Sequence, residues 1–407
     1  MRIKLEKSQI ARESELKITG SKSETNRLLL LQALYPQISL ANTSESDDSE
    51  AMRMALSSVS DIIDIHHAGT AMRFLTAYFS ICEGRTVTLT GSERMQQRPI
   101  GILVEALRDL GAHIEYVGNQ GFPPLKITGK KLSQNKVKLD AGVSSQYISA
   151  LLLIASRLEN GLELTLDGQI TSIPYIKMTL SLLDEIGIVS SFGENRIAIK
   201  AGQVLSKTIT VESDWSSASY FYSLVALSDA GTTIILSSYK PNSLQGDSAL
   251  AEIYRSFGVE TAFGENSIEL TKVASDKKAT LYFDLNDTPD IAQTIAVTAF
   301  GMGTGLELTG LHTLKIKETD RLEALKTELS KFGAKVSVSD DSLSLQASEQ
   351  IIGNVSVDTY NDHRMAMAFA PLALTTSFFV NDAEVVSKSF PTFWEDLEKL
   401  GISTANV

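Results

Sequence analysis

Cysteine is nearly absent from this 407-residue chain, where Cys82 is the single example. One thiol excludes a disulfide framework and a zinc site built from cysteines. No uninterrupted apolar run approaches the roughly 18 residues of a membrane-spanning helix, and the first residues lack the apolar segment of a secretory signal. Because a free thiol and no signal are typical of a reducing compartment, we expect a cytoplasmic protein without a membrane partner.

Positive charge is also in deficit, since 37 lysines and arginines stand against 49 acidic residues and give a net charge of −12. That balance argues against a general nucleic-acid binder, which would show a basic stripe. Hydrophobic residues make up 43% and charged residues 21% of the chain, which is ordinary for a globular protein and excludes disorder as its main state. The length predicts two or three domains.

A helix–glycine–strand junction recurs along the chain. It occurs at spacings of 68 to 76 residues, around Gly111, Gly187, Gly258, Gly333 and, more weakly, Gly401. One such junction is ordinary in an α/β protein, but five at nearly constant spacing favour internal duplication. Glycine suits the left-handed position that follows a helix. We therefore expect an α/β (α+β) chain of about six modules, each a βαβ unit followed by a hairpin.

The helix expected from residue 22 begins with a conflict of charge. Ser21 and Glu24 form the pattern of a capping box, and the run Leu28–Leu31 indicates a buried helix. Lys22 and Arg27 nevertheless lie near its start, where the helix dipole disfavours cations. A bound phosphate would remove the conflict, because the N–H groups at a helix start favour an anion.

Basic residues recur at the starts of further helices that are expected to be apolar. A polar residue at a helix start is ordinary, so Ser144, Asp214, Thr288 and Asp362 taken singly indicate only capping. Capping does not explain the basic residues, which are Lys22, Arg27, Arg73, Lys317, Arg321, Arg364 and Lys388. In a chain of net charge −12, this gathering of cations predicts a small polyanionic ligand.

Seven motifs, in their order and spacing, closely resemble those of the 5-enolpyruvylshikimate-3-phosphate synthase family. They are GSKSETNR at 20–27, AGTAMR at 68–73, RPIG at 98–101, SSQ at 144–146, KETDR at 317–321, NDHRM at 361–365 and KSFP at 388–391. SSQ alone is a weak signal, whereas GSKSxxNR, KETDR and NDHRM together are very specific. The resemblance runs from Gly20 to Pro391, nearly the whole chain.

The resemblance implies a two-domain inside-out α/β barrel. Each domain would hold three βαβαββ-like repeats whose buried helices point at the interdomain cleft, where the active site would lie. One domain would comprise residues 20–211, and the other residues 1–19 together with 212–407. The stretch 42–67 is short for the family, so one module is expected to lack its hairpin.

The resemblance also implies a transferase. The family moves the enolpyruvyl (carboxyvinyl) group of phosphoenolpyruvate to the 5-hydroxyl of shikimate-3-phosphate and releases phosphate, by addition and elimination, in the shikimate pathway to chorismate and the aromatic amino acids. The implied partners are these two small molecules, with no nucleic acid and no membrane, and the chain is expected to be a monomer. No cofactor is implied. No metal is expected either, because the seven cations and Arg98 can offset the roughly −5 to −6 charge of both substrates.

Site residues carry over motif by motif. The catalytic residues would be Lys22, Asp290 and Glu318, with the two carboxylates as the acid/base pair. Shikimate-3-phosphate would be bound by Lys22, Ser23, Arg27, Ser144, Ser145, Gln146, Ser172, Tyr175, Asp290 and Lys317. Phosphoenolpyruvate would be bound by Lys22, Gly69, Arg98, Gln146, Arg321, Arg364 and Lys388. Glyphosate, an inhibitor in this family, would occupy the phosphoenolpyruvate site, where Gly69 allows a close approach.

Three positions depart from the family pattern. His67 stands where Asn is usual, Ile173 where Lys is usual and Thr313 where Asn is common. A histidine can still donate one hydrogen bond, and threonine is shorter than asparagine. These departures are expected to alter individual contacts and not the reaction.

Two alternatives stay open. UDP-N-acetylglucosamine enolpyruvyl transferase shares the fold and the donor, but it typically has a Lys-Asn pair near its start and a cysteine before an Arg-Pro. Here the pair is Lys22-Ser23, residues 92–97 contain no cysteine, and Cys82 is interpreted as core packing. The second alternative is a catalytically silent homologue that binds phosphorylated metabolites. Lys22, Asp290, Glu318 and Arg364 argue against it.

Overall fold

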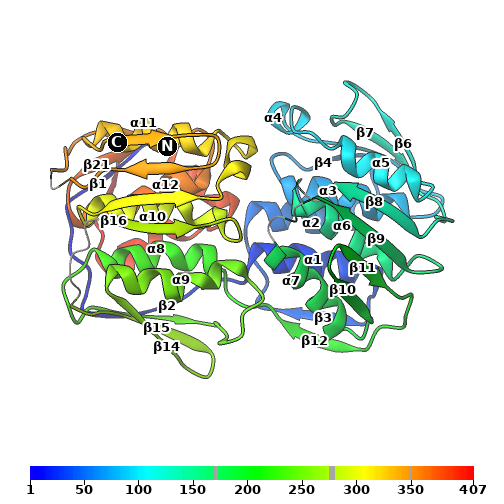
Figure 1. Cartoon of the computed structure of the whole chain (residues 1–407), viewed down its shortest axis with the longest axis horizontal. Coiled ribbons are helices and arrows are strands. Elements are labelled where there is room, and N and C mark those ends of the chain that lie inside the picture. The colour runs from blue at the N-terminus through cyan, green and yellow to red at the C-terminus, as the bar shows by residue number, and fades with distance from the viewer. Residues whose placement is uncertain (141, 143, 169, 171–172, 275–279, 349) are drawn as a thin grey trace. The chain divides into compact units, whose positions relative to one another are not determined.

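The computed structural model describes residues 1–407 except 141, 143, 169, 171–172, 275–279 and 349. The chain divides into two compact units (Figure 1): unit 1 is residues 1–19 with 212–407, and unit 2 is residues 20–211. Within the described residues each unit contains three small sheets. The α/β architecture built from about six repeated modules is therefore confirmed.

One module in unit 1 shows the repeated topology most plainly. Two parallel strands are joined through a buried helix, and an outer helix then leads into an antiparallel hairpin, so the sheet order is β16-β17-β19-β18. Its elements are β16 (Thr280–Asp284), η3 (Pro289–Ile291), α10 (Ala292–Gly301), β17 (Gly305–Thr309), η4 (His312–Ile316), α11 (Arg321–Lys331), β18 (Val336–Val338) and β19 (Leu343–Leu345).

Three further sheets repeat this order. In unit 2 they are β4-β5-β7-β6 and β8-β9-β11-β10, and in unit 1 it is β2-β13-β15-β14. The first contains β4 (Ile62–Asp64), α3 (Gly69–Ser80), β5 (Thr86–Thr90), α4 (Glu93–Gln96), α5 (Gly101–Asp109), β6 (His113–Tyr116) and β7 (Leu125–Thr128). The second contains β8 (Lys136–Asp140), α6 (Ser145–Ala155), β9 (Leu162–Asp167), α7 (Ile173–Glu185), β10 (Ser190–Gly193) and β11 (Arg196–Ile199). The third contains β2 (Glu13–Lys17), α8 (Trp215–Ala226), β13 (Thr233–Ser237), η1 (Gly246–Ala249), α9 (Leu250–Ile253), η2 (Tyr254–Phe257), β14 (Val259–Phe263) and β15 (Ser267–Lys272).

The N-terminal residues belong to unit 1 because their strands complete two of its sheets. β2 pairs in parallel with β13. β1 (Ile3–Leu5) lies between the strands β21 and β22 and pairs with both in antiparallel fashion. The rest of that module is β20 (Ser356–Val357), α12 (His363–Phe369), η5 (Ala370–Leu374), β21 (Phe378–Val380), η6 (Ala383–Lys388), α13 (Phe393–Leu400) and β22 (Thr404–Asn406).

The sixth sheet has two strands in the described residues, β12 (Lys207–Thr210) paired in parallel with β3 (Ile38–Ala41). After α1 (Lys22–Leu34) and β3, the chain passes through α2 (Asp47–Ser57) directly to β4 without a hairpin. The hairpin missing from this module, expected from the short stretch 42–67, is confirmed.

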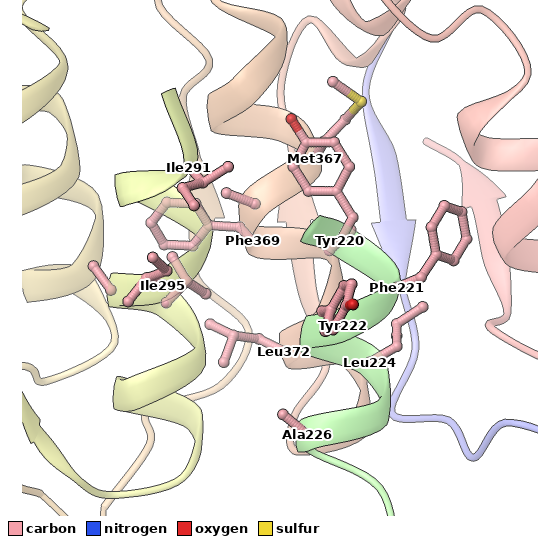
Figure 2. Packing of buried hydrophobic residues seen from close by; sticks show 14 of the residues in the cluster. Tyr220, Phe221, Tyr222, Leu224, Ala226, Ile291, Ile295, Met367, Phe369 and Leu372 are labelled. Carbon is pink, nitrogen blue, oxygen red and sulfur yellow. The ribbon is translucent and has the colours of Figure 1, made fainter. Parts of the chain in front are cut away.

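Helices, and not sheets, form the centre of each unit. In unit 2, α1, α3 and α6 contact one another, and in unit 1, α10 contacts both α8 and α12 (Figure 1). Every residue of α12 is buried, as is every residue of α8 except Ser216. Figure 2 shows buried side chains that these three unit 1 helices contribute to one hydrophobic cluster, among them Phe221, Ile295 and Phe369. Such all-round burial explains why these segments lack a polar stripe.

The repeated glycines have the expected backbone conformation. The φ angles lie in the left-handed region at all five, namely Gly111 (105°), Gly187 (93°), Gly258 (73°), Gly333 (94°) and Gly401 (108°). Residues with a Cβ rarely adopt this conformation. The periodic glycines therefore mark where the outer helix of a module ends and the next strand begins.

Candidate active site

A cluster of charged side chains lies in unit 1 where four helical segments begin or end. Asp290 belongs to η3, Arg321 is the first residue of α11, Asp362 caps α12 and Arg364 is its second residue. Lys317 and Glu318 lie in the segment between η4 and α11, and Lys388 ends η6. The topology thus joins three of the sequence motifs with Asp290.

Arg321 is the centre of this cluster. Its Nε donates to Asp362 Oδ2 at 2.6 Å, its Nη1 to Asp290 Oδ1 at 3.0 Å and its Nη2 to Glu318 Oε2 at 2.8 Å. The Arg321 side chain is only 3% exposed. A guanidinium can serve three carboxylates in this way because its five donors point outward in one plane.

The other three cations complete a network around the same carboxylates. Lys388 Nζ lies 2.8 Å from Glu318 Oε1. Lys317 Nζ lies 3.6 Å from Asp290 Oδ1, and Arg364 Nη2 lies 3.4 Å from Asp290 Oδ2. Four cations therefore meet three carboxylates in this network, which gathers the positive charge that an anionic ligand needs.

The network fixes the charge state of Asp290. Burial by itself would raise the pKa of this carboxyl, but the nearby charges of Lys317, Arg364 and Arg321 outweigh burial and hold the pKa well below its ordinary value. Burial likewise disfavours the charged form of Arg321, yet Asp362, Glu318 and Asp290 raise its pKa above the ordinary value. Asp290 is consequently an ionised carboxylate at neutral pH, and the same cations make it a weak base.

In unit 2, Arg27 is buried against the neighbouring helices. Its Nε donates to Thr179 Oγ1 at 2.8 Å, its Nη1 to the Ser23 carbonyl at 2.8 Å, and its Nη2 to Ser149 Oγ at 3.1 Å and the Tyr175 carbonyl at 3.4 Å. These bonds use four of the five N–H groups of a guanidinium. Burial lowers the pKa of Arg27 to about 10, so the side chain stays charged at neutral pH.

Lys22 lies at the first position of α1, where the sequence predicts an anion site. Ser21 caps this helix by accepting from the Glu24 N–H at 3.5 Å. Lys22 Nζ lies 3.3 Å from Asp48 Oδ2, and the Lys22 side chain is 17% exposed while that of Asp48 is 7% exposed. Asp48 thus holds the lysine at the helix start and partly offsets its charge.

The SSQ motif begins α6 as expected. Ser144 caps the helix by accepting from the Gln146 N–H at 3.3 Å. The Gln146 side chain donates to Thr70 Oγ1 at 3.2 Å, which connects the starts of α6 and α3. Ser145 and Tyr175 are half-buried, so their side chains are partly accessible.

Gly69 and Arg98 are in close contact. A Cβ built on Gly69 would lie 2.5 Å from Arg98 Nη1, well inside contact distance. The Arg98 guanidinium therefore lies directly against Gly69 in this structure. Arg73 has a different role in the same region, because it is buried and donates to the Gly69 carbonyl at 3.2 Å and the Pro99 carbonyl at 3.0 Å.

Several expectations need correction. Lys388 does not begin the last helix: it ends η6, and α13 starts only at Phe393, after Pro391. Arg321 begins α11, which is not apolar throughout, because Glu323 on it is exposed. Thr288 precedes η3 without a side-chain capping bond. The expected contact residue Ser172 lies outside the described residues.

The three departures from the family pattern are accommodated without disturbing the clusters. His67 is exposed, and its Nδ1 lies 2.8 Å from Ser92 Oγ. Ile173 is the first residue of α7. Thr313 lies in η4, and its hydroxyl has no hydrogen-bond partner among the described residues.

Some contributors escaped the sequence analysis. Asp48, Ser149 and Thr179 in unit 2 and Ser216 in unit 1 contact the predicted site residues, and Asp247 contacts Ser216. Asp362 was interpreted as a cap alone, but it also pairs with Arg321. Their partners are far away in sequence, so no local pattern reveals them. Asp362 of the NDHRM motif is the exception, because its position directly before His363 and Arg364 could have indicated a charged contact.

The described part of the chain contains no group of three or more His, Cys, Asp or Glu side chains arranged to hold a metal ion. None of the helices described has both the length and the apolar character needed to span a membrane.

The chain is similar to known proteins over nearly its whole length. A family model described as EPSP synthase (3-phosphoshikimate 1-carboxyvinyltransferase) matches residues 54–397. A 3-phosphoshikimate 1-carboxyvinyltransferase of Bacteroides fragilis strain YCH46 is 46% identical over 394 residues, covering 96% of this chain and 95% of that protein. One of Sulfurovum sp. strain NBC37-1 is 37% identical over 420 residues, covering 95% and 96%.

Solved structures share the fold. EPSP synthase from Acinetobacter baumannii superposes with a TM-score of 0.81 at 21% identity and full coverage of both chains. The enolpyruvyl transferase NikO from Streptomyces tendae gives a TM-score of 0.73 at 11% identity, covering 100% of this chain and 98% of that one. With the family model matching most of the chain, this protein belongs to the EPSP synthase family.

Proposed function

We propose that the protein transfers the enolpyruvyl group of phosphoenolpyruvate to the 5-hydroxyl of shikimate-3-phosphate and releases phosphate. The observation that carries this proposal is the network of Lys317, Arg321, Arg364 and Lys388 around Asp290 and Glu318, in a chain of this family. Such a network joins anion-binding groups to carboxylates that can move protons. The product leads through chorismate to the aromatic amino acids.

The acceptor substrate is assigned mainly to unit 2. Ser23, Arg27, Ser144, Ser145, Gln146, Ser172 and Tyr175, with Lys22, bind shikimate-3-phosphate in this proposal, and Asp290 and Lys317 of unit 1 face its hydroxyls. Four of these residues, Lys22, Ser23, Ser145 and Gln146, belong to the first turns of α1 and α6, where backbone N–H groups favour a phosphate. Arg27 supplies a positive charge whose position is fixed, because its Nε and Nη1 groups donate to protein acceptors.

The donor substrate is assigned to residues of both units. Lys22, Gly69, Arg98 and Gln146 come from unit 2, and Arg321, Arg364 and Lys388 come from unit 1. Phosphoenolpyruvate carries a phosphate and a carboxylate, and arginine is the side chain best suited to bind both in planar, paired hydrogen bonds. The carboxylates that now occupy Arg321 and Lys388 hold these cations in place before the substrate arrives.

The chemistry requires two proton movements. In the addition step the 5-hydroxyl loses its proton as its oxygen bonds to C2 of phosphoenolpyruvate, and C3 gains a proton to become a methyl group. In the elimination step the C2–phosphate bond breaks, phosphate leaves and C3 loses a proton. Asp290 is assigned to accept the hydroxyl proton, although the cations that keep it ionised also make it a weak base. Glu318, between Arg321 and Lys388, is assigned to C3. Lys22 is the cation assigned beside them.

The structure of the cysteine region disfavours the rival enolpyruvyl transferase. Cys82 Sγ donates to the Tyr78 carbonyl at 3.2 Å, and burial raises the pKa of its thiol. A thiol in this state is a poor acid/base or nucleophilic group. Residues 92–97, where the rival has its cysteine, form the cap and body of α4 and contain none.

A cytoplasmic location and a monomeric state are part of the same proposal. In a monomer, one chain must supply all the assigned site residues. This chain contains every motif to which they belong. Size measurement of the purified protein would test this directly.

The function is tested by phosphate release from the purified protein. Phosphate should appear with shikimate-3-phosphate and phosphoenolpyruvate together and not with either alone. Turnover with UDP-N-acetylglucosamine as acceptor would support the rival enzyme, and absence of turnover with every acceptor would support the silent homologue. Cys82→Ser should keep the wild-type rate, because no step uses the thiol.

A further inference from the structure

Asp247 is a buried carboxyl of unit 1 to which the proposed mechanism gives no role. It lies in η1, is only 4% exposed, and its Oδ1 has no hydrogen-bond partner among the described residues. Its Oδ2 accepts a hydrogen bond from Ser216 Oγ. A carboxyl buried with one oxygen unsatisfied costs stability, so packing alone is a poor explanation for its presence.

Ser216 connects this carboxyl to the proposed substrate site. Its Oγ accepts from Arg364 Nη2 at 3.2 Å while its own proton points to Asp247. Ser216 is also the one residue of α8 that is not buried. The resulting hydrogen-bond path, Arg364 to Ser216 to Asp247, ends on a negative charge, and a charged end strengthens such a path.

Arg364 is held from a second side by Asp290. Its Nη1 donates to the Asp290 carbonyl at 3.0 Å, and its Nη2 lies 3.4 Å from Asp290 Oδ2. In the proposed reaction the Asp290 carboxylate turns to a substrate hydroxyl and takes its proton. The path through Ser216 to Asp247 still holds Arg364 on the protein side when this pairing with Asp290 is lost.

We propose that Asp247 is a positioning residue that orients Arg364 through Ser216 for binding of phosphoenolpyruvate. The inference rests on the proposed function, and it adds to that function a determinant of donor affinity outside the residues that touch the substrate. Asp247 itself moves no proton in the reaction. Its contribution should therefore be seen in KM for phosphoenolpyruvate and not in kcat.

Two substitutions interrupt the path at different points. Ser216→Ala removes the middle group with little change in volume, and Asp247→Asn removes the charge at the end. Each should raise KM for phosphoenolpyruvate about tenfold, the order expected for one charge-assisted hydrogen bond. KM for shikimate-3-phosphate and kcat should stay within about twofold of wild type, which is ordinary variation for an uninvolved group.

The double variant and a matched control sharpen the test. Ser216→Ala with Asp247→Asn should raise KM for phosphoenolpyruvate no further than either alone, because both break one path. Ser223→Ala removes a different hydroxyl of α8, one that is buried and accepts from Thr298 at 2.7 Å, and should leave this KM unchanged.

The pH dependence supplies a readout that a merely structural role would not move. Burial and the nearby Asp290 raise the pKa of Asp247 to about 7, against the opposing effects of Arg364 and the Ser216 hydrogen bond; Asp214 raises it further. Glu252 of the adjacent α9 is exposed and pairs with Arg255. Because protonation removes the charge that orients Arg364, KM for phosphoenolpyruvate should rise below about pH 7. In Asp247→Asn this rise in KM should be absent. Any pH dependence that comes from phosphoenolpyruvate itself should be the same in wild type and variant, so it does not affect the comparison.

Each outcome decides between distinct conclusions. Unchanged KM for phosphoenolpyruvate in both single variants would overturn the inference. So would a parallel loss of kcat and of affinity for both substrates together with a lower melting temperature, since that pattern marks a structural role. If wild type releases no phosphate, the proposed function fails, and the inference falls with it.

Discussion

Glu318 is the residue whose role is most open to a direct test. It is held between Arg321 Nη2 and Lys388 Nζ, each at 2.8 Å, so its carboxylate has a fixed position. Glu318→Gln keeps the size but removes the acid/base capacity, and kcat should fall by roughly 10²–10⁴ with smaller changes in KM. Steady-state kinetics would show this, with Glu323→Gln, an exposed residue of α11, as a control that keeps kcat. A Glu318→Gln enzyme with wild-type kcat would contradict the assignment.

The charge of Asp290 should affect how the stability of the protein depends on pH. Its pKa is lowered in the folded protein, because Lys317, Arg364 and Arg321 overcome the effect of burial. A group of this kind contributes stability above its unfolded pKa, near 3.9, and the contribution is lost as pH falls through the lower folded value. Asp290→Asn should therefore lower the free energy of unfolding by about 3 kcal/mol at neutral pH. The difference from wild type should shrink below about pH 4, as urea titrations can measure. A difference that grows on acidification would contradict the ionised state of Asp290.

At the scale of elements, Arg27 connects three helices of unit 2. From α1 it bonds to Ser149 of α6 and to Thr179 and the Tyr175 carbonyl of α7. Arg27→Ala leaves these buried acceptors without their donor, so the free energy of unfolding should fall by about 3 kcal/mol. KM for shikimate-3-phosphate should rise in the same variant. Arg196→Ala, at an exposed arginine, should do neither, and normal stability of Arg27→Ala would refute this structural role.

At the start of α3, the close contact between Gly69 and Arg98 leads to a second prediction. Gly69→Ala would place a Cβ 2.5 Å from Arg98 Nη1, so the guanidinium has to move away from the helix start. KM for phosphoenolpyruvate should rise about threefold to tenfold, as for one weakened charged hydrogen bond. Inhibition by glyphosate should weaken more, because the longer ligand also needs the space beside Gly69. Gly193→Ala, where an added Cβ would meet no atom within 4 Å, is the matched control and should change neither. If Gly69→Ala weakened the binding of phosphoenolpyruvate and of glyphosate by the same factor, a separate steric effect on glyphosate would be excluded.

Local features of these elements were predictable from the sequence because their causes are local. Ser21, Ser144, Asp214 and Asp362 cap their helices with side-chain bonds to N–H groups two or three residues on. The position of Lys388 was wrong because the helix does not begin until after Pro391; the preceding segment is a separate 3-10 helix.

At the scale of the whole molecule, the repeats predicted the modular fold, and long-range contacts decided the rest. Four of the sheets have the same strand order, as repeated modules predict. The N-terminus supplies one strand to each of two sheets in unit 1. Arg321 could be recognised as a site residue, but its bonds to Asp290 and Asp362 join residues 31 and 41 positions away. Asp247 reaches Arg364 through Ser216, 148 positions before Arg364. Such partners depend on how the modules pack, which no local pattern encodes.

The central claim is that the protein adds shikimate-3-phosphate to phosphoenolpyruvate and then eliminates phosphate from the adduct. Addition makes C3 of phosphoenolpyruvate a methyl group, and elimination removes one of its three hydrogens. Turnover in D₂O followed by mass spectrometry of the product tests this directly. The account predicts that deuterium enters the transferred group and that phosphate is released only when shikimate-3-phosphate is present. Phosphate release with no deuterium in the product, or release without the acceptor, would contradict it.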